Sequence, residues 1–531
     1  MTDRARRLWR RVAIAALIAT TTLFIIGVIV LHNAGPILKG RIIETLSTRF
    51  DSRVELDNLD VSVGRGIEVA GRGLRIFPPE AVVTAGAKQP LIAIRNFHFH
   101  SGVGGLFLKP MHVAAVSVTG LDINIPPREI REQAPKTSGK RKGKIKIVLG
   151  EILCDDSRLV IGTNKPDKDP KNFVLRHIEL HNVGPNAPWR YDAILTNAVP
   201  RGEIKSSGAF GPWRTESPGD SYVDGHYVFS HADLNTIKGI GGILSSTGDF
   251  KGQLNRIEVH GTTHTPDFSL DTANRGILLD TEFQAIVDGT SGDTYLQPVN
   301  AKLGESTFTV RGAVISIKGK GHRVQLDADI PAGKISDFLS LAVKTEPPVL
   351  TGILQTKTRI IIEPGTQSVT QKLKSTGAFT LRQIHFTNPA VEDKVDMLSL
   401  RARGEPKKAK PGATDVNSRM QGSFSIGGGR IVFNHLSYSL PGAQVNLAGV
   451  YSMDGQQFNF RGKVRTKATL RQMVGSWWKS WLLTPVSPFF KKDGAGAEIP
   501  VTISGTRSEP KFGLDLFHRS DKHKSRESDK N

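Results

Sequence analysis

The amino-acid sequence alternates apolar and polar side chains at every second position over long stretches from residue 54 onward. Successive side chains of a β-strand point to opposite faces of a sheet, so this period predicts strands with one apolar and one polar face. Glycines between such stretches indicate hairpins and bulges. The sequence therefore predicts a mainly β fold with a few short helices. The apolar members of the clearest stretches are Val324, Leu326, Ala328 and Ile330, then Val445 and Leu447, then Phe458, Phe460 and Val464.

A short glycine and phenylalanine signal recurs within the predicted strands. The copies are irregularly spaced, which argues against a solenoid of fixed period and against a propeller with evenly spaced blades. They indicate a β-unit used several times with insertions. Helices are expected at 232–239, 334–342 and 469–483. Gly-x-Phe stands at 208–210, 248–250, 377–379 and 422–424, and a longer pattern at 259–270 returns at 503–514.

One uncharged segment is long enough to cross a membrane. Residues 12–31 read VAIAALIATTTLFIIGVIVL, and a helix of that length spans a hydrocarbon core of about 30 Å. Residues 1–11 hold five arginines, and positive charge is retained on the cytoplasmic side. We therefore expect a cytoplasmic tail at 1–11, a transmembrane anchor at 12–31, and the bulk of the chain across the membrane. The alternative is a cleaved signal peptide, whose apolar region would be unusually long.

Residues 32–53 carry an amphipathic pattern that predicts a helix at the membrane surface. Pro36 suits a first helical position, and Leu38, Ile42 and Leu46 follow at a spacing of four. This apolar stripe can seat the exported part on the membrane, cap a β-core, or do both, and we favour the cap slightly.

Three tryptophans form a second candidate for contact with the membrane interface. Trp477, Trp478 and Trp481 lie close together in the helix expected at 469–483. A tryptophan satisfies both its apolar ring and its polar N–H at a membrane interface. A hydrophobic plug at the end of a β-structure would use the same residues, and we favour the plug slightly.

The chain is strongly basic, with 71 Lys and Arg against 50 Asp and Glu, a net charge of +21. Such a balance suggests an anionic partner. There is no zinc-finger spacing and no RNA-binding aromatic motif, so we expect no nucleic acid, and the predicted anchor makes a membrane surface the better partner. Residues 126–144 read as a basic loop, and 518–531 as a disordered basic tail.

The sequence contains no recognisable catalytic motif and only weak candidates for a metal site. The pairs His98/His100, His177/His181 and His260/His264 lie in predicted strands, where a spacing of four does not form the zinc pair of a helix, and no carboxylate stands at a matching spacing. G-x-S-x-G and H-E-x-x-H are absent, and one cysteine cannot build a disulfide framework. We expect no catalytic residue, no metal and no cofactor. A single cysteine also fits an oxidising compartment such as a periplasm.

Four segments resemble the AsmA family of inner-membrane-anchored periplasmic proteins, relatives of TamB and of the chorein-type bridge-like lipid-transfer proteins. They begin PILKGRIIETLSTRF at 36, ADLNTIKGIGG at 232, LPGAQVNLAGV at 440 and PVSPFFKKDGAG at 485. The resemblance implies an N-terminal β-rich region at 54–230 and a C-terminal region at 231–517. It implies an elongated, twisted antiparallel sheet curled into a groove with an apolar interior, which the alternating residues above would line. It implies no catalytic residues.

The leading functional hypothesis is an inner-membrane-anchored periplasmic protein that binds phospholipids and conducts them toward the outer membrane, supporting envelope integrity. The alternative is a scaffold or assembly factor for outer-membrane proteins without lipid transport, in which the β-region has an ordinary core and binds partners through strand edges. Phospholipids and the inner membrane are the expected partners of the first hypothesis, and outer-membrane or periplasmic proteins those of the second. A third reading, an enzyme acting on periplasmic glycans, has no motif in its support.

Overall fold

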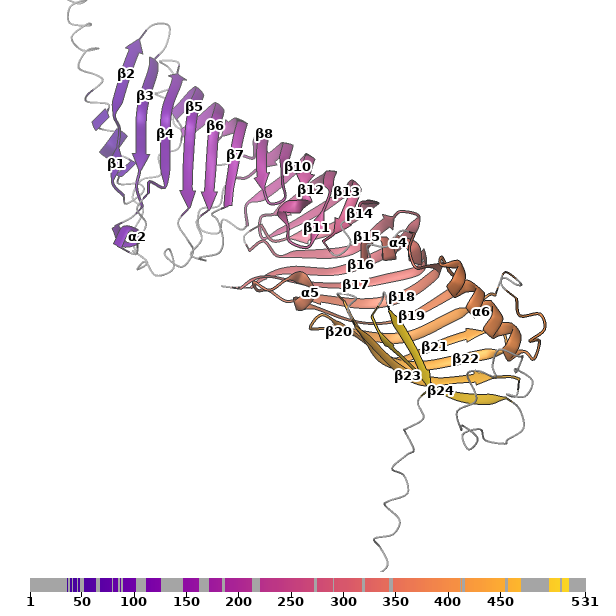
Figure 1. Cartoon of the computed structure of the whole chain (residues 1–531). Coiled ribbons are helices and arrows are strands. Elements are labelled where there is room, and N and C mark those ends of the chain that lie inside the picture. The colour runs from indigo at the N-terminus through magenta and orange to yellow at the C-terminus, as the bar shows by residue number, and fades with distance from the viewer. Residues whose placement is uncertain are drawn as a thin grey trace, which may run out of the picture. The chain divides into compact units, whose positions relative to one another are not determined.

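The structure is a computed structural model (Figure 1). It describes scattered positions between 36 and 47 and most of residues 52–514, and its longer gaps are 102–110, 126–146, 162–170, 213–219 and 469–495. Strands dominate these residues and helices are short and few, so the prediction of a mainly β fold is confirmed. The chain divides into two compact units: unit 1 comprises 1–232 and 247–257, and unit 2 comprises 233–246 and 258–531.

Unit 1 is a sheet in which each strand from β2 to β9 pairs with the next one along the chain. In addition, β1 pairs with β3, and β10 pairs with both β9 and β12. The elements are β1 Val54–Glu55, β2 Asn58–Val63, β3 Ile67–Ile76, α2 Glu80–Thr84, β4 Ile92–Ser101, β5 Met111–Ile125, β6 Ile147–Ile161, β7 Lys171–Val183, β8 Trp189–Ala198, β9 Arg201–Phe210, β10 Tyr222–Asp233 and β12 Ile243–Gln253, whose greater part belongs to this unit.

The pair β5–β6 is parallel, running from Met111 opposite Ile147 to Ile125 opposite Ile161. This corrects the expectation of a purely antiparallel sheet: the sheet is mixed. Antiparallel neighbours can be joined by a tight hairpin, whereas parallel neighbours need a connection long enough to return to the starting end. Residues 126–146 separate the two strands in the sequence, and their number permits that return.

The predicted helix before the first strand packs against the core of unit 1. The described positions between 36 and 47 are helical, and Ile42, Ile43 and Leu46 contact a buried cluster of the first strands. These side chains therefore cap the sheet, as the second of the two readings proposed. The side chain of Leu38 lies outside the described residues. The buried cluster consists of Val54, Leu56, Leu59, Val69, Leu74 and Ile76.

Unit 2 is an antiparallel ladder in chain order from β14 to β25. Before it, β11 pairs with β13. The elements are η3 Leu234–Thr236, β11 Ile240–Gly241, β13 Arg256–Leu270, β14 Ile277–Val287, β15 Thr294–Leu303, β16 Ser306–Ile317, β17 Gly321–Lys334, α4 Ile335–Ala342, β18 Leu350–Ile362, α5 Val369–Lys372, β19 Leu373–Phe386, α6 Pro389–Ala402, β20 Arg419–Gly427, β21 Arg430–Leu440, β22 Ala443–Ser452, β23 Phe458–Thr466, β24 Ala497–Gly505 and β25 Pro510–Leu514.

The helix predictions had mixed outcomes. The helix expected at 334–342 is confirmed as α4, while the one expected at 232–239 is only the single 3₁₀ turn η3. Residues 469–483 lie outside the described residues. The longest described helix, α6, was not predicted, although Asn388 accepts hydrogen bonds from the N–H groups of Ala390 and Val391, and Pro389 opens the helix.

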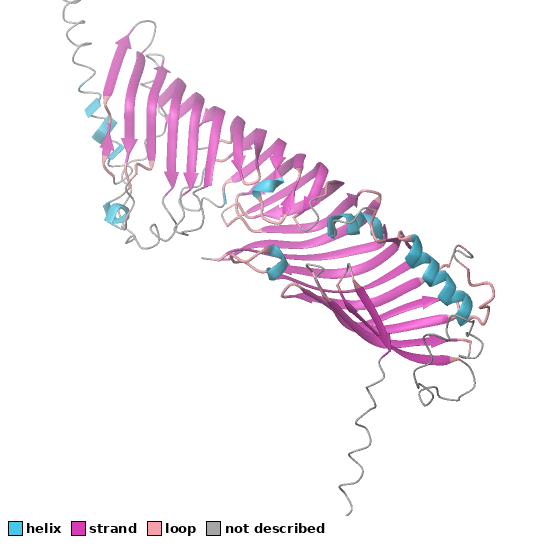
Figure 2. Ribbon diagram, viewed as in Figure 1, coloured by secondary structure: helices cyan, strands magenta, loops and turns pink. Residues whose placement is uncertain are grey.

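Helices α4 and α6 lie along one end of the unit 2 strands (Figures 1 and 2). Two buried hydrophobic clusters of unit 2 lie next to these helices. Phe338 of α4 packs on the first of two clusters, where β17 ends and β18 begins. The second cluster lies beside the end of α6 and includes Ala402 of that helix. The helices thus cover one end of the sheet's apolar side. The first cluster is Ile330, Leu354, Leu381 and Ile384, and the second is Ala402, Val416, Leu440 and Ala443.

Replacing Leu46 tests the cap. Leu46→Ala removes apolar contacts with the first strands and should lower the free energy of unfolding of unit 1 by about 1–2 kcal/mol, less than for a fully buried leucine. Urea denaturation with limited proteolysis measures the change. Glu44→Gln, at an exposed position of the same helix, is the control. Equal stability of the two variants would contradict the cap and leave the membrane-surface reading.

The ion pairs of Glu498 should make the stability of unit 2 depend on pH. Its carboxylate lies 2.6 Å from Lys463 Nζ and 2.8 Å from Arg465 Nε, and the hydrogen bond from Lys463, followed by that from Arg465, lowers its pKa. A lowered pKa in the folded state means that stability is present above the ordinary glutamate pKa and is lost as pH falls through the lowered value. Because the groups are partly exposed, solvent screening keeps the contribution below about 1 kcal/mol.

Glu498→Gln should therefore be slightly less stable than the parent at about pH 7, and equally stable at a pH below the lowered pKa of Glu498, where the parent carboxylate is protonated. Thermal melting at both pH values measures this. A difference that persists unchanged in acid would contradict the assignment.

Candidate functional site

All nine residues predicted to line a groove lie on one side of the unit 2 sheet, which we call the apolar face. Residues directly opposite each other in a ladder point to the same face. Leu326 of β17 is opposite Ile360 of β18, and this pairing continues strand by strand to Phe458, which is opposite Tyr451 of β22. The bulges in these ladders do not invert the face, since Phe433 and Leu436 of β21 lie opposite Gly449 and Leu447.

Among the residues that the structure describes, only part of the apolar face is covered. Ile330 is buried in the core cluster beside α4, at 6 % exposure. The other eight residues are half-buried: Val324, Leu326, Ala328, Val445, Leu447, Phe458, Phe460 and Val464. Large apolar side chains that keep contact with solvent over many adjacent strands form an apolar surface available to a ligand. The uncovered part lies toward the strand ends away from α4 and α6.

A row of aromatic rings begins at Phe379, which packs against the core cluster beside α4, and continues from there across neighbouring strands. Phe379 lies 6.3 Å from both Phe424 and Phe433, and Phe433 lies 5.9 Å from Phe460, measured between ring centroids. Phe458 continues the row at 6.4 Å from Phe460 and stacks on Tyr451. The row connects β19 to β23. Of its members only Phe458 and Phe460 were predicted; Phe379 and Phe424 carried a signal in the Gly-x-Phe repeats.

The Gly-x-Phe repeats have a structural explanation in β19 and β20. Gly377 is directly opposite Phe424, and Phe379 is directly opposite Gly422, so the two copies pair reciprocally. A Cβ on Gly377 would lie 2.8 Å from Lys357 O and 2.9 Å from Phe424 Cζ, so the backbone of β18 and the ring together occupy the space that a side chain would need. Glycine at this position therefore leaves room for the aromatic ring over the neighbouring strand.

The two faces of the sheet differ chemically. On the polar face Arg359 binds both carboxylate oxygens of Asp327, at 2.6 and 3.1 Å, and Lys357 lies 2.8 Å from Asp329. The Arg359 hydrogen bond lowers the pKa of Asp327. On the apolar face the hydroxyl of Thr356 donates to Ala378 O at 2.8 Å. Because the Thr356 hydroxyl is already hydrogen-bonded to the backbone, it does not prevent the apolar face from contacting hydrocarbon.

Unit 1 repeats the same division. One face carries half-buried apolar side chains: Phe97 and Phe99 of β4, Ile152 of β6 and Ile178 of β7. The opposite face carries charged and polar groups.

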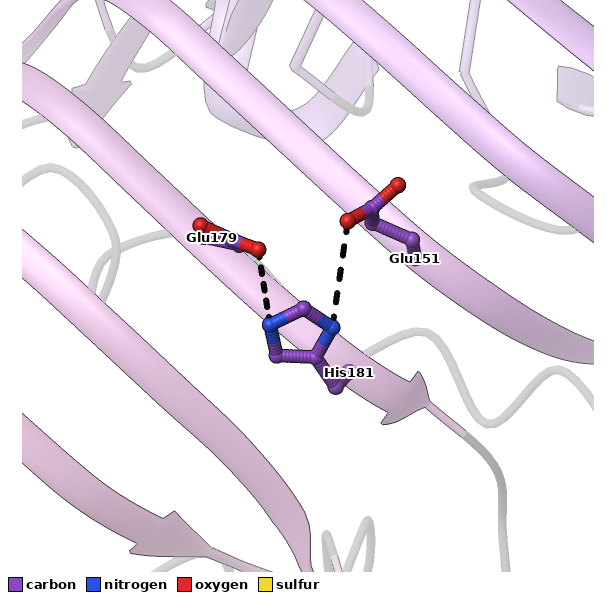
Figure 3. A group of neighbouring side chains, drawn as sticks. All are labelled: Glu151, Glu179 and His181. Carbon is purple, nitrogen blue, oxygen red and sulfur yellow. Dashed lines mark ion pairs between the residues drawn. The ribbon is translucent and has the colours of Figure 1, made fainter.

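The predicted histidine pairs all lie on strands. His100 lies 3.6 Å from Glu68, and His264 lies 2.6 Å from Asp280. On β7, however, Glu179 stands between His177 and His181 on the same face, and Glu151 of β6 is opposite His181 (Figure 3). The expectation that no carboxylate stands at a matching position is therefore wrong. On a strand, positions i, i+2 and i+4 share a face, so a helix is not required.

The other predicted membrane contacts are not described. Residues 12–31 and Trp477, Trp478 and Trp481 lie outside the described residues, so the anchor and the interfacial tryptophans stay predictions. Among the residues that the structure does describe, no helix combines the length and hydrophobicity needed to cross a membrane.

Gly377→Ala tests the reciprocal pairing. The added methyl group must displace Phe424 or the backbone, and overpacking of this kind typically costs about 1–3 kcal/mol of unfolding free energy. Gly427→Ala in the same pair of strands is the control, because a Cβ there meets nothing within 4 Å. Chemical denaturation compares the two, and equal stability would contradict the proposed role of Gly377.

In comparisons with known proteins, no protein-family model, no curated protein and no solved structure matches this chain.

Proposed function

We propose that this chain is an inner-membrane-anchored periplasmic protein that binds phospholipids along the apolar face and conducts them toward the outer membrane. The observation that supports it most strongly is the half-covered apolar face of unit 2, with its aromatic row across β19 to β23. The resemblance of four segments to the AsmA family and the uncharged segment at 12–31 agree with it.

The energetics favour an acyl chain as the occupant. Burial of hydrocarbon gains about 0.8 kcal/mol per CH₂ group, and a lipid would cover half-exposed residues such as Leu326 and Phe460. The headgroup would stay in water at the rim, where it needs no dedicated polar pocket. Because neighbouring strands offer equivalent apolar surface, a bound chain can move from one to the next at low cost. The sequence contains no nucleotide motif, so the transfer is passive in this proposal.

The uneven covering of the face argues against an ordinary core as its whole purpose. An ordinary core would bury the large residues along the full length of the strands. Here the residues next to α4 and α6 are buried, whereas those farther along the same strands are half-exposed. One end of the face thus stabilises the fold, and the other end is free to receive a ligand.

Site-specific photo-crosslinking in cells tests the proposal. A photoreactive amino acid at Leu326 or Phe458 should form covalent adducts with phospholipids, identified by mass spectrometry. The same residue at Asn459, an exposed position on the polar face between Phe458 and Phe460, is the matched control. Adducts to proteins in place of lipids would favour the assembly-factor alternative, and an absence of adducts at both apolar positions would overturn the lipid proposal.

Charged substitutions separate binding from folding. Leu326→Glu and Phe458→Glu should sharply reduce the phospholipid that co-purifies with the chain while leaving the fold intact, because a carboxylate at a half-exposed position stays hydrated. Ile330→Glu, at a buried position, should unfold unit 2 instead. Asn459→Glu should change neither property. Lipid extraction and circular dichroism measure both, and unchanged lipid in the first two variants would contradict a continuous binding face.

A further inference from the structure

Five acidic and histidine side chains gather on the polar face of β6 and β7 in unit 1, and none of them belongs to the proposed lipid surface of unit 2. His181 Nε2 lies 2.8 Å from Glu179 Oε1, and His181 Nδ1 lies 3.9 Å from Glu151 Oε1 (Figure 3). On the other side of Glu179, His177 Nε2 lies 3.8 Å from its second oxygen, and His177 Nδ1 lies 2.7 Å from Asp155. The result is a chain of alternating imidazoles and carboxylates.

The strand register creates this gathering. Glu179 and His181 are two residues apart on β7 and therefore share a face, about 7 Å apart along the strand. Glu151 of β6 is directly opposite His181, and Asp155 is directly opposite His177. One carboxylate from each strand is thus brought to His181, although 28 residues separate Glu151 from Glu179 in the sequence.

We propose that Glu151, Glu179 and His181 bind a divalent first-row transition-metal ion such as Zn²⁺. One ligand atom from each of the three residues lies within 4.8 Å of the other two. Bonds of about 2.0–2.2 Å to Zn²⁺ require these atoms to approach one another by about 1 Å, which side-chain rotation can supply. An imidazole nitrogen with two carboxylate oxygens is a donor set that zinc accepts, and it leaves a fourth position for water.

The surroundings of the three residues suit a cation. On the β5 side, Ala115 is opposite Glu151, and Ser117 follows on the same face, so these two described neighbours bring no positive charge to the site. On the β8 side, Arg190 is opposite His181 and Asp192 is opposite Glu179, so these two charges offset each other. The three proposed ligands are half-buried, which limits competition from water.

His177 acts as a positioning residue in this proposal. It contacts the oxygen of Glu179 that faces away from His181, while Asp155 holds its other ring nitrogen. Such outer contacts fix the orientation of a ligand carboxylate, and their loss typically weakens metal binding by about 10–100-fold. The bound ion would connect β6 to β7, so binding should also stabilise unit 1.

The test is a calorimetric titration of the metal-depleted full-length chain with Zn²⁺. We expect one ion per chain at a site that Glu179→Gln and His181→Ala remove and that His177→Ala weakens by about tenfold. The isosteric Glu151→Gln, which changes charge but little volume, should also lose the site with its circular dichroism spectrum unchanged. His264→Ala is the matched control, because His264 pairs with the single carboxylate Asp280 on a different strand pair.

A second readout separates the site from adventitious binding to other histidines. Zn²⁺ should raise the melting temperature of the parent chain and of His264→Ala, and should leave that of Glu179→Gln unchanged. Binding of equal affinity and stoichiometry in the parent and Glu179→Gln, or no binding tighter than about 0.1 mM in the parent, would overturn the proposal. The five side chains would then serve only as an ion-pair network between β6 and β7.

Discussion

Cross-strand register is the constraint on which this structure depends. Because directly opposed residues in a ladder point to the same face, each hydrogen-bonded pairing transmits the apolar and polar sides of one strand to the next. In unit 2 the transmission survives bulges in several ladders, including the one between Ser423 and Phe424 in β20–β21. A slip of one residue in any pair would place apolar side chains among the ion pairs. The apolar face is therefore a property of the whole ladder and not of any one strand.

The covering of that face by helices decides where the fold is stabilised and where it is open. Helices α4 and α6 follow the ends of β17 and β19 and cover the same end of the ladder, where Ile330 and Ile384 are buried. Farther along the strands, aromatic rings lie over glycines of neighbouring strands, as Phe424 does over Gly377. The rings contribute packing within the sheet and stay only half-buried, which is what the proposed lipid-binding surface requires.

The polar face uses the same register for a different purpose. In unit 2 it aligns opposite charges, such as Asp327 with Arg359, directly across the ladder. In unit 1 it gathers potential metal ligands: Glu151 lies opposite His181, and Glu179 is two residues before His181 on the same strand. Charge pairing and a candidate cation site thus arise from one geometric rule applied to different side chains.

Much of the fold was predictable from residues that are close in the sequence. Alternation within β17, β22 and β23 placed nine residues on one face of their strands, and the structure has them on one face of the sheet. The helix α4 was also predicted, whereas α6 was not, even though Asn388 and Pro389 carry a helix-start signal. A helix-start signal of this kind is easily overlooked when the flanking segments alternate apolar and polar residues as strands do.

What the sequence by itself determined is which side of each strand is apolar, because a period of two is a local property of consecutive residues. Only the tertiary structure decided which strands are neighbours. That choice made β5 and β6 parallel, put Phe424 over Gly377, buried Ile330 while leaving Leu326 half-exposed, and brought Glu151 beside His181. Each of these depends on hydrogen bonding between segments far apart in the chain, and the alternation within one strand carries no information about its partner.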